Sequence, residues 1–533
     1  MMSGIGANGP DLVKERFRTS EGIYKVAHNV SFYTTLGLKH PKMPLPRISM
    51  FTLKDQFGSR NKMVYNLMRD LYLLNVSDPL QLDVERSVQG KHTFKDKCPT
   101  CHDVNLLTRS KDSVQLIVGL TDGQVHLINP LKWEFLKIYN ENYQIENGDS
   151  CVTCVKWVPG SETQFIASYS SGNMYLFNTL YCTKTSMNEP PISFTLSKQG
   201  DSYNILVYRG KNRTKEITKW ELRCGPIHEF SFSPDCKHLA IVSQDGFLRV
   251  FDFLSEDMIA AMRSYFGGLL CVCWSPDGRY IVTGGEDDLV TVWSLNDQRI
   301  TARGEGHRSW VTMVTFDPYN SKGITSNGAP CEEETTTKLP VYRFGSVGQD
   351  AHVIFWDLCE DSLEAVQPWR TKTPSSETSH TADNGSAHNN ADKVRSISEI
   401  KVSNTSGLSS TGYSSLTLPL KGSASKKSNK VADAAATLPH RNKFTKLRSF
   451  VRHSHSDTHL SDAAVLRNIQ CFTILDTVKV PRLYDVPRID PLVCKRVSTE
   501  RLTCILFTKD HVILSCNEGS ISIWARPGVA MVT

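Results

Sequence analysis

The chain has 533 residues, 40% hydrophobic and 22% charged, so it can bury a large apolar core and has the composition of a globular protein. Its formal charge of +6 is concentrated in residues 371–470, where 14 Lys and Arg accompany 7 Asp and Glu, which leaves the rest of the chain close to neutral. A nearly neutral folded part excludes a broad nucleic-acid-binding face, because such a face needs many cations to neutralise phosphates.

Residues 1–45 are predicted to be an N-terminal extension that precedes the repeats. Residues 1–10 lack a basic patch followed by an apolar run, and no uncharged apolar run in the chain approaches the roughly 20 residues that span a bilayer. The 15 cysteines are an odd number spread along the chain, which favours reduced thiols over a disulfide framework. We therefore expect a cytoplasmic protein that makes no membrane contact.

A repeat dominates residues 46–370. An aromatic residue before a turn recurs at Phe232, Trp274 and Phe316, a spacing of 42 each time, which falls within the period of roughly 40 to 45 residues of WD-repeat propeller blades. Each unit has short strands with alternating apolar residues, separated by Ser-Pro-Asp and Asp-Gly turns. Divergent units occur at residues 63–74, 99–128, 152–177 and 502–524. The sequence therefore predicts an all-β fold, a seven-bladed WD-repeat β-propeller.

Two inserts interrupt the repeat. The step from Trp157 to Phe232 is 75 residues, which predicts an extra loop or an irregular blade within residues 181–223. Residues 371–470 contain 29 Ser or Thr and few large apolar side chains, so burial cannot offset the entropy of ordering them. We predict a disordered insert between the outer strands of the last two blades, and a return to the ring through residues 471–533 as the closing blade.

The composition of this insert suggests regulation. Serines stand beside basic residues, the context that basophilic kinases require, at Ser396, Ser398, Ser449 and Ser454. Residues 421–430 resemble a nuclear import signal, which adds the nucleus to the expected locations. Phe444, Leu447 and Val451 have helical spacing among basic residues, as in an amphipathic helix at a partner or membrane surface. A solvated disordered segment is the alternative for all three features.

Cys98-Pro-Thr-Cys101-His102 has the spacing of c-type haem attachment and of half a zinc site. The repeat favours a structural role, because Cys101 stands at a strand position where a small apolar residue packs. Other units fill that position with Cys154, Cys271 and Cys504. We therefore expect no metal and no cofactor.

His307, Ser346 and Asp350 allow a catalytic interpretation as a Ser-His-Asp set. With Trp356 they also match a structural interpretation, in which a turn His, a strand Ser, a turn Asp and a strand Trp form a buried hydrogen-bonded set within one blade. We predict the structural role. The equivalent turns of other units carry Asp245, Asp287 and Asp288. Because no other nucleophile, metal cluster or cofactor loop stands out, we expect no enzymatic activity.

Large aromatic residues stand in two loops where the fold does not need them. Counting five residues back from each pre-turn aromatic gives the first residue of a strand, and the residues before it belong to the top face of the propeller. Tyr265 and Phe266 occupy one such loop, and Arg308 and Trp310 occupy the loop of the next unit. Such side chains bury much area at a low entropy cost, so we predict a partner-binding site. The alternative is that Phe266 folds down between blades.

Several strings go beyond the general repeat pattern and extend over most of the chain. They are Arg18–Lys25, Val152–Gly160, Val242–Phe251, Ser264–Gly278, Gly284–Trp293, Tyr342–Asp350 and Leu502–Gly528. These strings resemble the WD repeat-containing protein 20 family, which includes the dystrophia myotonica WD repeat protein. The inserts, above all residues 358–470, match that family poorly.

The resemblance implies a non-catalytic cofactor, monomeric before complex formation, that activates ubiquitin-specific protease 12 or 46 allosterically alongside a second WD-repeat cofactor. It also implies that Phe266 and Trp310 contact the protease on the top face. A different class stays open, a scaffold or a substrate receptor of a ubiquitin ligase complex. Such receptors commonly end a blade with Trp-Asp-x-Arg, whereas this chain has Trp356-Asp-Leu-Cys359.

Overall fold

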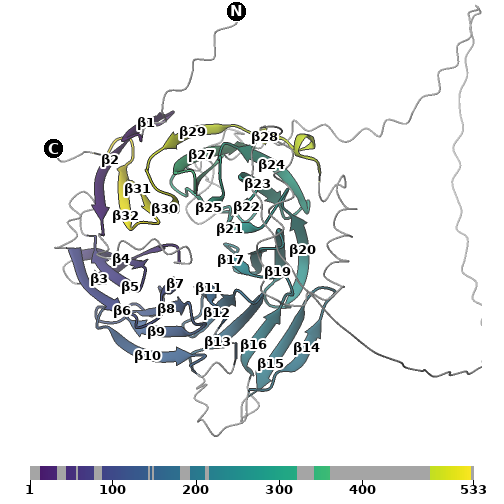
Figure 1. The fold of residues 1–533 in the computed structure, drawn as a ribbon. Coiled ribbons are helices and arrows are strands. Elements are labelled where there is room, and N and C mark those ends of the chain that lie inside the picture. The colour runs from purple at the N-terminus through teal and green to yellow at the C-terminus, as the bar shows by residue number, and fades with distance from the viewer. Residues whose placement is uncertain are drawn as a thin grey trace, which may run out of the picture. The chain divides into compact units, whose positions relative to one another are not determined.

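The structure is a computed structural model in which ten segments of the chain are described. They are residues 13–32, 44–55, 58–76, 87–141, 145–146, 149–180, 192–209, 215–320, 341–359 and 481–529. The strands of these residues form seven sheets, arranged as blades around a central axis (Figure 1). The prediction of an all-β, seven-bladed propeller is confirmed. No helix among the described residues is long and apolar enough to cross a membrane.

Blades 1, 2 and 4 have four antiparallel strands each, and blade 5 has four such strands plus the short parallel strand β28 (Arg488–Ile489) at its outer edge. The four antiparallel strands follow chain order from the axis outward (Figure 1). Blade 1 has β3 (Ile48–Asp55), β4 (Gly58–Leu67), β5 (Asp70–Asn75) and β6 (Val88–Thr93); blade 2 has β7 (Pro99–Asn105), β8 (Gln115–Leu120), β9 (Val125–Asn129) and β10 (Glu134–Tyr139). Blade 4 has β17 (Ile227–Phe232), β18 (His238–Ser243), β19 (Phe247–Asp252) and β20 (Asp257–Arg263); blade 5 has β21 (Leu269–Trp274), β22 (Tyr280–Gly285), β23 (Leu289–Ser294) and β24 (Arg299–Glu305). The first strands of neighbouring blades pack against one another.

The Ser-Pro-Asp sequences form the turns between first and second strands. In blade 5 the Ser275 hydroxyl donates to Asp277 Oδ1 at 2.7 Å and accepts the N–H of Tyr280 at 2.9 Å. Gly278 completes this turn with a φ of 74°, in the left-handed region that glycine favours. Local side-chain hydrogen bonds therefore fix the turns that the repeat predicts.

Blade 3 explains the long step between Trp157 and Phe232. It begins with β11 (Val152–Trp157), β12 (Gln164–Tyr169) and β13 (Asn173–Asn178), and it continues with β14 (Thr195–Gln199), β15 (Asn204–Arg209) and β16 (Lys215–Glu221). The fourth position, next to β13, is taken by β16, while β15 and β14 extend the sheet outward. Within residues 181–223, β16 therefore supplies the fourth strand, and the β14–β15 hairpin adds two strands outside it, so that blade 3 has six strands. Tyr203 of this hairpin packs edge-on against Phe251 of blade 4.

The long insert interrupts one blade instead of joining two. Blade 6 has β25 (Val311–Phe316), β26 (Val341–Gly348), β27 (His352–Cys359) and, as its outer strand, β29 (Pro491–Arg496). The insert therefore separates the third and fourth strands of blade 6, and the predicted place between two blades was wrong. The insert itself, with its predicted disorder and its four candidate phosphorylation sites, lies outside the described residues.

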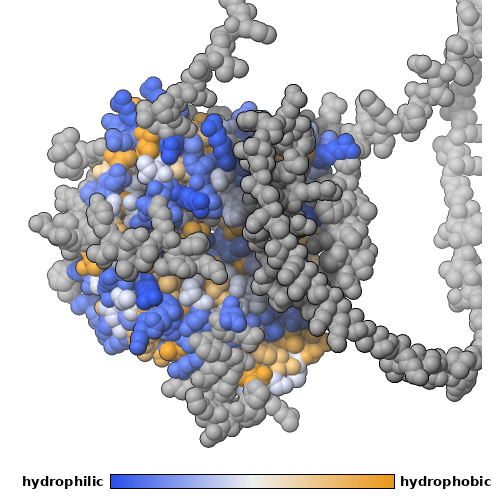
Figure 2. Space-filling model, viewed as in Figure 1, coloured by the Kyte–Doolittle hydropathy of each residue, from blue (hydrophilic) through white to orange (hydrophobic). Residues whose placement is uncertain are grey.

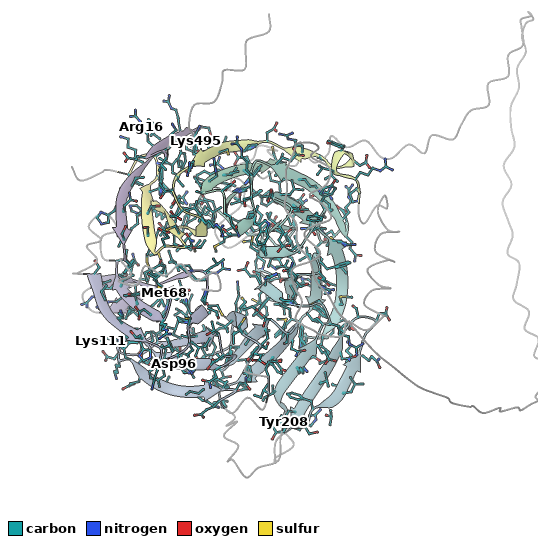
Figure 3. The ribbon with its side chains drawn as sticks, viewed as in Figure 1. Arg16, Met68, Asp96, Lys111, Tyr208 and Lys495 are labelled. Atoms are coloured by element: carbon teal, nitrogen blue, oxygen red, sulfur yellow. The ribbon has the colours of Figure 1, made fainter. Side chains whose placement is uncertain are left out.

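Both ends of the described chain close the ring. Blade 7 has β30 (Leu502–Phe507), β31 (His511–Cys516) and β32 (Ser520–Ala525), followed by β2 (Gly22–Ser31) and β1 (Arg16–Thr19). The N-terminal segment thus supplies the outer strands of blade 7, so residues 1–45 are not merely an extension. The Lys14 N–H also donates to Arg496 O at 2.9 Å, and Figure 3 shows Arg16 of β1 beside Lys495 of β29.

Apolar side chains fill the spaces between neighbouring blades. Trp293, Trp356 and Trp524 are among the largest fully buried side chains, and burying an aromatic side chain of this size stabilises a fold by about 3 kcal/mol. On the face seen in Figure 2, hydrophilic and hydrophobic residues are interspersed, with a hydrophobic area over β14–β16. Leu196 of β14 is 58% exposed.

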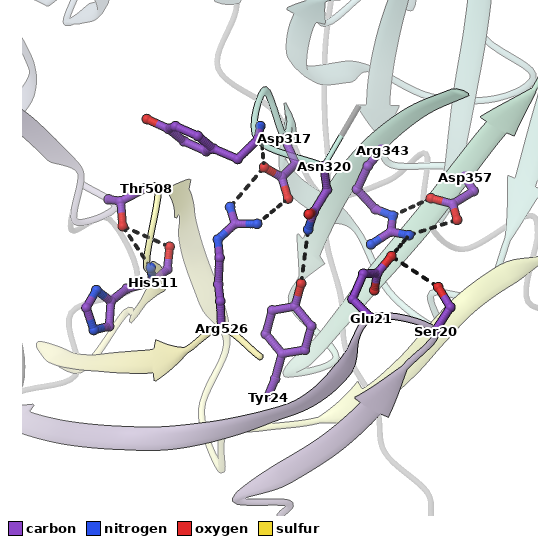
Figure 4. A network of polar contacts seen from close by, with 11 residues as sticks. Ser20, Glu21, Tyr24, Asp317, Asn320, Arg343, Asp357, Thr508, His511 and Arg526 are labelled. Atoms are coloured by element: carbon purple, nitrogen blue, oxygen red, sulfur yellow. Dashed lines mark hydrogen bonds and ion pairs between the residues drawn. The ribbon is translucent and has the colours of Figure 1, made fainter. Parts of the chain in front are cut away.

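A polar network joins the chain ends to blade 6 (Figure 4). Arg343 donates to Glu21 Oε1 at 2.7 Å and to both carboxylate oxygens of Asp357. Although burial opposes the shift, the hydrogen bond and charge of Arg343 lower the pKa of Glu21 to about 2. Glu21 therefore stabilises the closed ring in its ionised form.

We expect Glu21→Gln to lower the free energy of unfolding by about 1 kcal/mol near neutral pH, a small value because the Glu21 side chain is 25% exposed. The folded-state pKa lies below the unfolded value of 4.5, so the difference from the wild type should be constant above about pH 5 and shrink as the pH falls toward 2. Urea unfolding at several pH values measures it, with the exposed Glu15→Gln as the matched control. A pH-independent difference would contradict the ion-pair assignment.

Candidate functional site

The loop between β20 and β21 presents two aromatic side chains. The Ser264 hydroxyl donates to Gly267 O at 2.9 Å, and the Gly268 N–H donates to Glu286 Oε2 at 2.9 Å. Gly267 has a φ of 65°, and a Cβ there would lie 2.9 Å from the Glu286 Cβ. With its backbone held in this way, the loop leaves Phe266 65% exposed and Tyr265 46% exposed. The alternative in which Phe266 packs between blades is not what the structure has.

The loop between β24 and β25 presents Arg308 and Trp310. The Arg308 N–H donates to Asp350 Oδ2 at 2.9 Å, and the Trp310 carbonyl accepts the N–H of Gln349 at 2.9 Å. Trp310 is 43% exposed, and Arg308 is also exposed. The turn between β26 and β27 therefore fixes this loop.

Both loops lie on the same face of adjacent blades. Each one follows an outer strand and precedes an inner strand, and each is held by the turn between the second and third strands of a blade. We call this end of the propeller the top face, and we call Tyr265, Phe266, Arg308 and Trp310 the top-face patch. Exposed aromatic and Arg side chains on a fixed backbone are typical of protein-binding surfaces.

The structure brings the four residues of the possible catalytic set together inside blade 6. His307 Nε2 lies 2.8 Å from Ser346 Oγ, which also accepts the Trp356 indole N–H at 2.8 Å. His307 Nδ1 lies 3.0 Å from Asp350 Oδ2. The His307 side chain has no exposed area, and Ser346 is fully buried. A substrate therefore has no access to this serine in the described fold, and the set links the core of the blade to the top face.

Asp350 joins that set to the Arg308 loop. Burial opposes ionisation, but the hydrogen bond and charge of His307 and the N–H groups of Arg308 and His352 lower the pKa of Asp350. Of the equivalent aspartates, Asp245 accepts the Ser243 hydroxyl at 2.7 Å, and Asp287 accepts the Leu289 N–H at 3.2 Å. These aspartates therefore shape their turns.

The Cys98–His102 segment is occupied by internal contacts. His102 Nδ1 lies 2.9 Å from Ser49 Oγ, and its Nε2 lies 3.3 Å from Arg47 O. Burial lowers the pKa of His102 to about 4. Cys101 is buried in the inner strand β7. Among the residues that the structure describes, no group of three or more His, Cys, Asp or Glu side chains could hold a metal ion.

The recurrent cysteine position lies at a register shift in each inner strand concerned. Burial raises the pKa of Cys154 to about 11, so this thiol is neutral. The repeat in the sequence predicts only small apolar residues at this position, and the structure does not bear this out. Blade 4 has Glu229 there, and its Oε2 accepts the N–H of Val272 in the next blade at 3.0 Å.

Sequence reasoning missed Arg303 of β24. Its guanidinium carbon lies 5.4 Å from the ring centroid of Tyr265, and the residue is only 2% exposed. The strand also carries Arg299, Thr301 and Glu305, so its sequence does not mark Arg303 as buried. The burial seen in the structure is what shows that this charge needs specific partners.

Comparison with known proteins places the chain in a class and then in a family. The family description "WD domain, G-beta repeat" matches residues 218–252 and 260–294, each from the fourth strand of one blade to the third strand of the next. Together with the seven blades, these matches define a WD-repeat β-propeller protein, and the repeats support a role in protein interaction.

Two relatives define the family more closely. The chain is 37% identical to "WD repeat-containing protein 20" of Mus musculus, over 97% of each chain. It is 31% identical to the "WD repeat-containing protein 20 homolog" of Caenorhabditis elegans, over 88% of this chain and 71% of the relative. The chain therefore belongs to the WD repeat-containing protein 20 family. A chain of the solved "Crystal Structure of Mitotic Checkpoint Complex" aligns with a TM-score of 0.48 and 10% identity, over 98% of this chain and 97% of the other.

Proposed function

We propose that the chain is a non-catalytic regulatory subunit of ubiquitin-specific proteases of the 12 or 46 type. In this proposal it binds the protease through the top-face patch, acts beside a second WD-repeat cofactor in the cytoplasm and nucleus, and raises the rate of deubiquitination. The supporting observation is the exposure of Phe266 and Trp310 on two fixed loops of adjacent blades.

The geometry of the patch supports tight binding. Its aromatic side chains offer a large contact area with few rotatable bonds. The Gly268 and Arg308 N–H groups donate to the carboxylates of Glu286 and Asp350, which hold the loop backbones before any partner arrives. Little ordering entropy is therefore lost on association. Tyr, Trp and Arg are the residue types most often found at binding hot spots.

Allosteric activation requires that the propeller bind the active conformation of the protease more tightly than the inactive one. A coupling free energy of about 1–3 kcal/mol corresponds to roughly 5- to 150-fold in that preference. A rigid platform that touches the protease away from its catalytic centre can supply such a difference. If the propeller makes no contact with ubiquitin, the turnover number should rise while the KM for ubiquitin substrates changes little.

The double variant Phe266→Ala with Trp310→Ala tests the proposal. Each truncation at a hot spot costs about 2 kcal/mol or more, so we expect protease binding to weaken by at least about 100-fold and activation to be lost. Cleavage of a ubiquitin-fluorophore conjugate by purified protease and second cofactor measures activation, and calorimetry measures binding. Leu254→Ala is the matched control, because Leu254 is 94% exposed in the β19–β20 turn on the opposite face.

Two results would contradict different parts of the proposal. Full activation by the double variant would exclude the top-face patch as the binding site. Failure of the wild-type chain to bind either protease would exclude the protease-subunit function, and a ligase scaffold or receptor would then be sought by co-purification. Such a receptor would use the Trp-Asp end of a blade. Here Asp357 at that end already accepts a hydrogen bond from Arg343, with Nη2 2.9 Å from Oδ2.

A further inference from the structure

The segment that returns from the long insert crosses the outside of two blades. We call residues 481–489 the strap. Its η2 turn (Leu483–Asp485) is followed by β28 (Arg488–Ile489), which pairs in parallel with the outer strand β24. The Arg303 N–H donates to Pro487 O at 2.9 Å. Figure 1 shows β28 beside β24 at the rim of the ring.

The strap is anchored in the apolar core between blades 4 and 5. Val486 is 8% exposed and belongs to a cluster with Met262 of β20 and Ile300 of β24. Ile489 is 3% exposed and packs into the cluster between blades 5 and 6. In contrast, Tyr484 points into solvent and is 93% exposed. The strap therefore has two buried anchors and one exposed turn.

Strap carbonyls hold the guanidinium of Arg303. Its Nη1 donates to Arg482 O at 3.2 Å and to Pro481 O at 3.5 Å, and its Nη2 donates to Pro481 O at 3.4 Å. Burial lowers the pKa of Arg303, and the negative charge of Asp287 opposes this shift. A buried guanidinium needs hydrogen-bond acceptors, and here the strap backbone provides them for both Nη groups.

The other side of Arg303 faces the top-face patch. The guanidinium lies 5.4 Å from the ring centroid of Tyr265, within the range of a cation–π interaction. Asp287 lies in the neighbouring β22–β23 turn, where its Oδ1 accepts the Leu289 N–H at 3.2 Å. Burial raises the pKa of Asp287 to about 6, and the charge of Arg303 opposes that rise. Arg303 therefore reaches the Tyr265–Phe266 loop through the Tyr265 ring.

We infer that the strap positions the Tyr265–Phe266 loop through Arg303, so that the return end of the insert tunes the top-face patch. Arg303 is a positioning residue, since its burial keeps it from touching a partner. The coupling within the chain does not depend on who the partner is. Its effect on a protease does rest on the proposed function.

Hydrogen–deuterium exchange on the full chain tests the coupling. Arg303→Met keeps an unbranched apolar stem but removes the guanidinium, and Val486→Ala loosens the strap without touching Arg303. We expect amide exchange in residues 264–268 to rise about tenfold in both variants. The reason is that each variant weakens the cation–π contact between Arg303 and Tyr265 or the hydrogen bonds between Arg303 and the strap, which makes local opening of the loop easier. Tyr484→Ala, at the exposed turn, should leave the loop at the wild-type rate. Unchanged exchange in β30–β32 shows that each variant is folded.

The readouts separate this inference from the proposed function. Wild-type exchange in residues 264–268 of the folded Arg303→Met and Val486→Ala variants would overturn the inference, whether or not a protease binds. If Arg303→Met does not fold, Val486→Ala decides alone. Faster exchange in the loop supports the inference even where no protease binds the wild type, a result that counts against the proposed function only. Where protease does bind, both strap variants should weaken it by about tenfold and Tyr484→Ala should not.

Discussion

Asp317→Ala should lower the free energy of unfolding by about 3–5 kcal/mol, because it leaves a buried Arg without its counter-ion. Asp317 and Arg526 form a two-fold contact, with Nη1 2.7 Å from Oδ2 and Nη2 2.9 Å from Oδ1. Their side chains are 1% and 6% exposed. Asp317 directly follows β25 of blade 6 and Arg526 directly follows β32 of blade 7, so the pair closes the ring between these blades (Figure 4).

A double variant identifies the source of that loss. Asp317→Leu with Arg526→Met removes both charges and keeps apolar volume, and such replacements of buried ion pairs are often close to neutral. Urea unfolding of the full chain should therefore find the double variant more stable than Asp317→Ala. A loss below about 1 kcal/mol in Asp317→Ala would show that water already solvates Arg526 in the folded state.

This pair also separates stability from binding. Asp317 lies at the far end of β25 from Trp310, and a strand of this length spans roughly 20 Å. The fraction of Asp317→Ala that stays folded should therefore bind a top-face partner with wild-type affinity. Titration at a temperature well below the unfolding midpoint checks this.

The blades could be predicted from the sequence because their signals are local. An aromatic before a turn, a Ser-Pro-Asp turn and alternating strand residues all act within a few residues, as the Ser275–Tyr280 turn shows. The exposure of Phe266 and Trp310 was also predictable, since a loop position follows once the strands are counted. These features need no knowledge of distant partners.

The pairing of distant strands could not be read in the same way. An outer strand has one open edge, and alternation alone does not say which segment covers it. β2 pairs with β32 at the other end of the chain, and β16 rather than β14 takes the fourth place in blade 3. Arg303 was missed for the same reason, because its partners Pro481 and Arg482 belong to a segment beyond the insert.

Asp350→Ala should lower both the free energy of unfolding and the affinity for a partner, because Asp350 contacts both the core of blade 6 and the top face. Its carboxylate accepts from the Arg308 N–H at 2.9 Å and the His352 N–H at 3.1 Å and pairs with His307 Nδ1. Leaving the buried His307 and His352 groups without this acceptor should cost about 3 kcal/mol of folding free energy. The Arg308–Trp310 loop also loses its anchor, so partner affinity should fall about tenfold.

Ser346→Ala is the control variant that separates loss of stability from loss of the anchor at Arg308. It removes the oxygen shared by His307 and Trp356 but keeps the bond from the Arg308 N–H to Asp350, so it should lose stability without losing affinity. Asp350→Asn retains an acceptor oxygen and should recover part of both losses. Thermal unfolding and calorimetric titration of the three variants, at temperatures where each is folded, measure the two effects separately. Equal affinity losses in Ser346→Ala and Asp350→Ala would mean that general loosening of blade 6, and not the anchor at Arg308, governs the top-face patch.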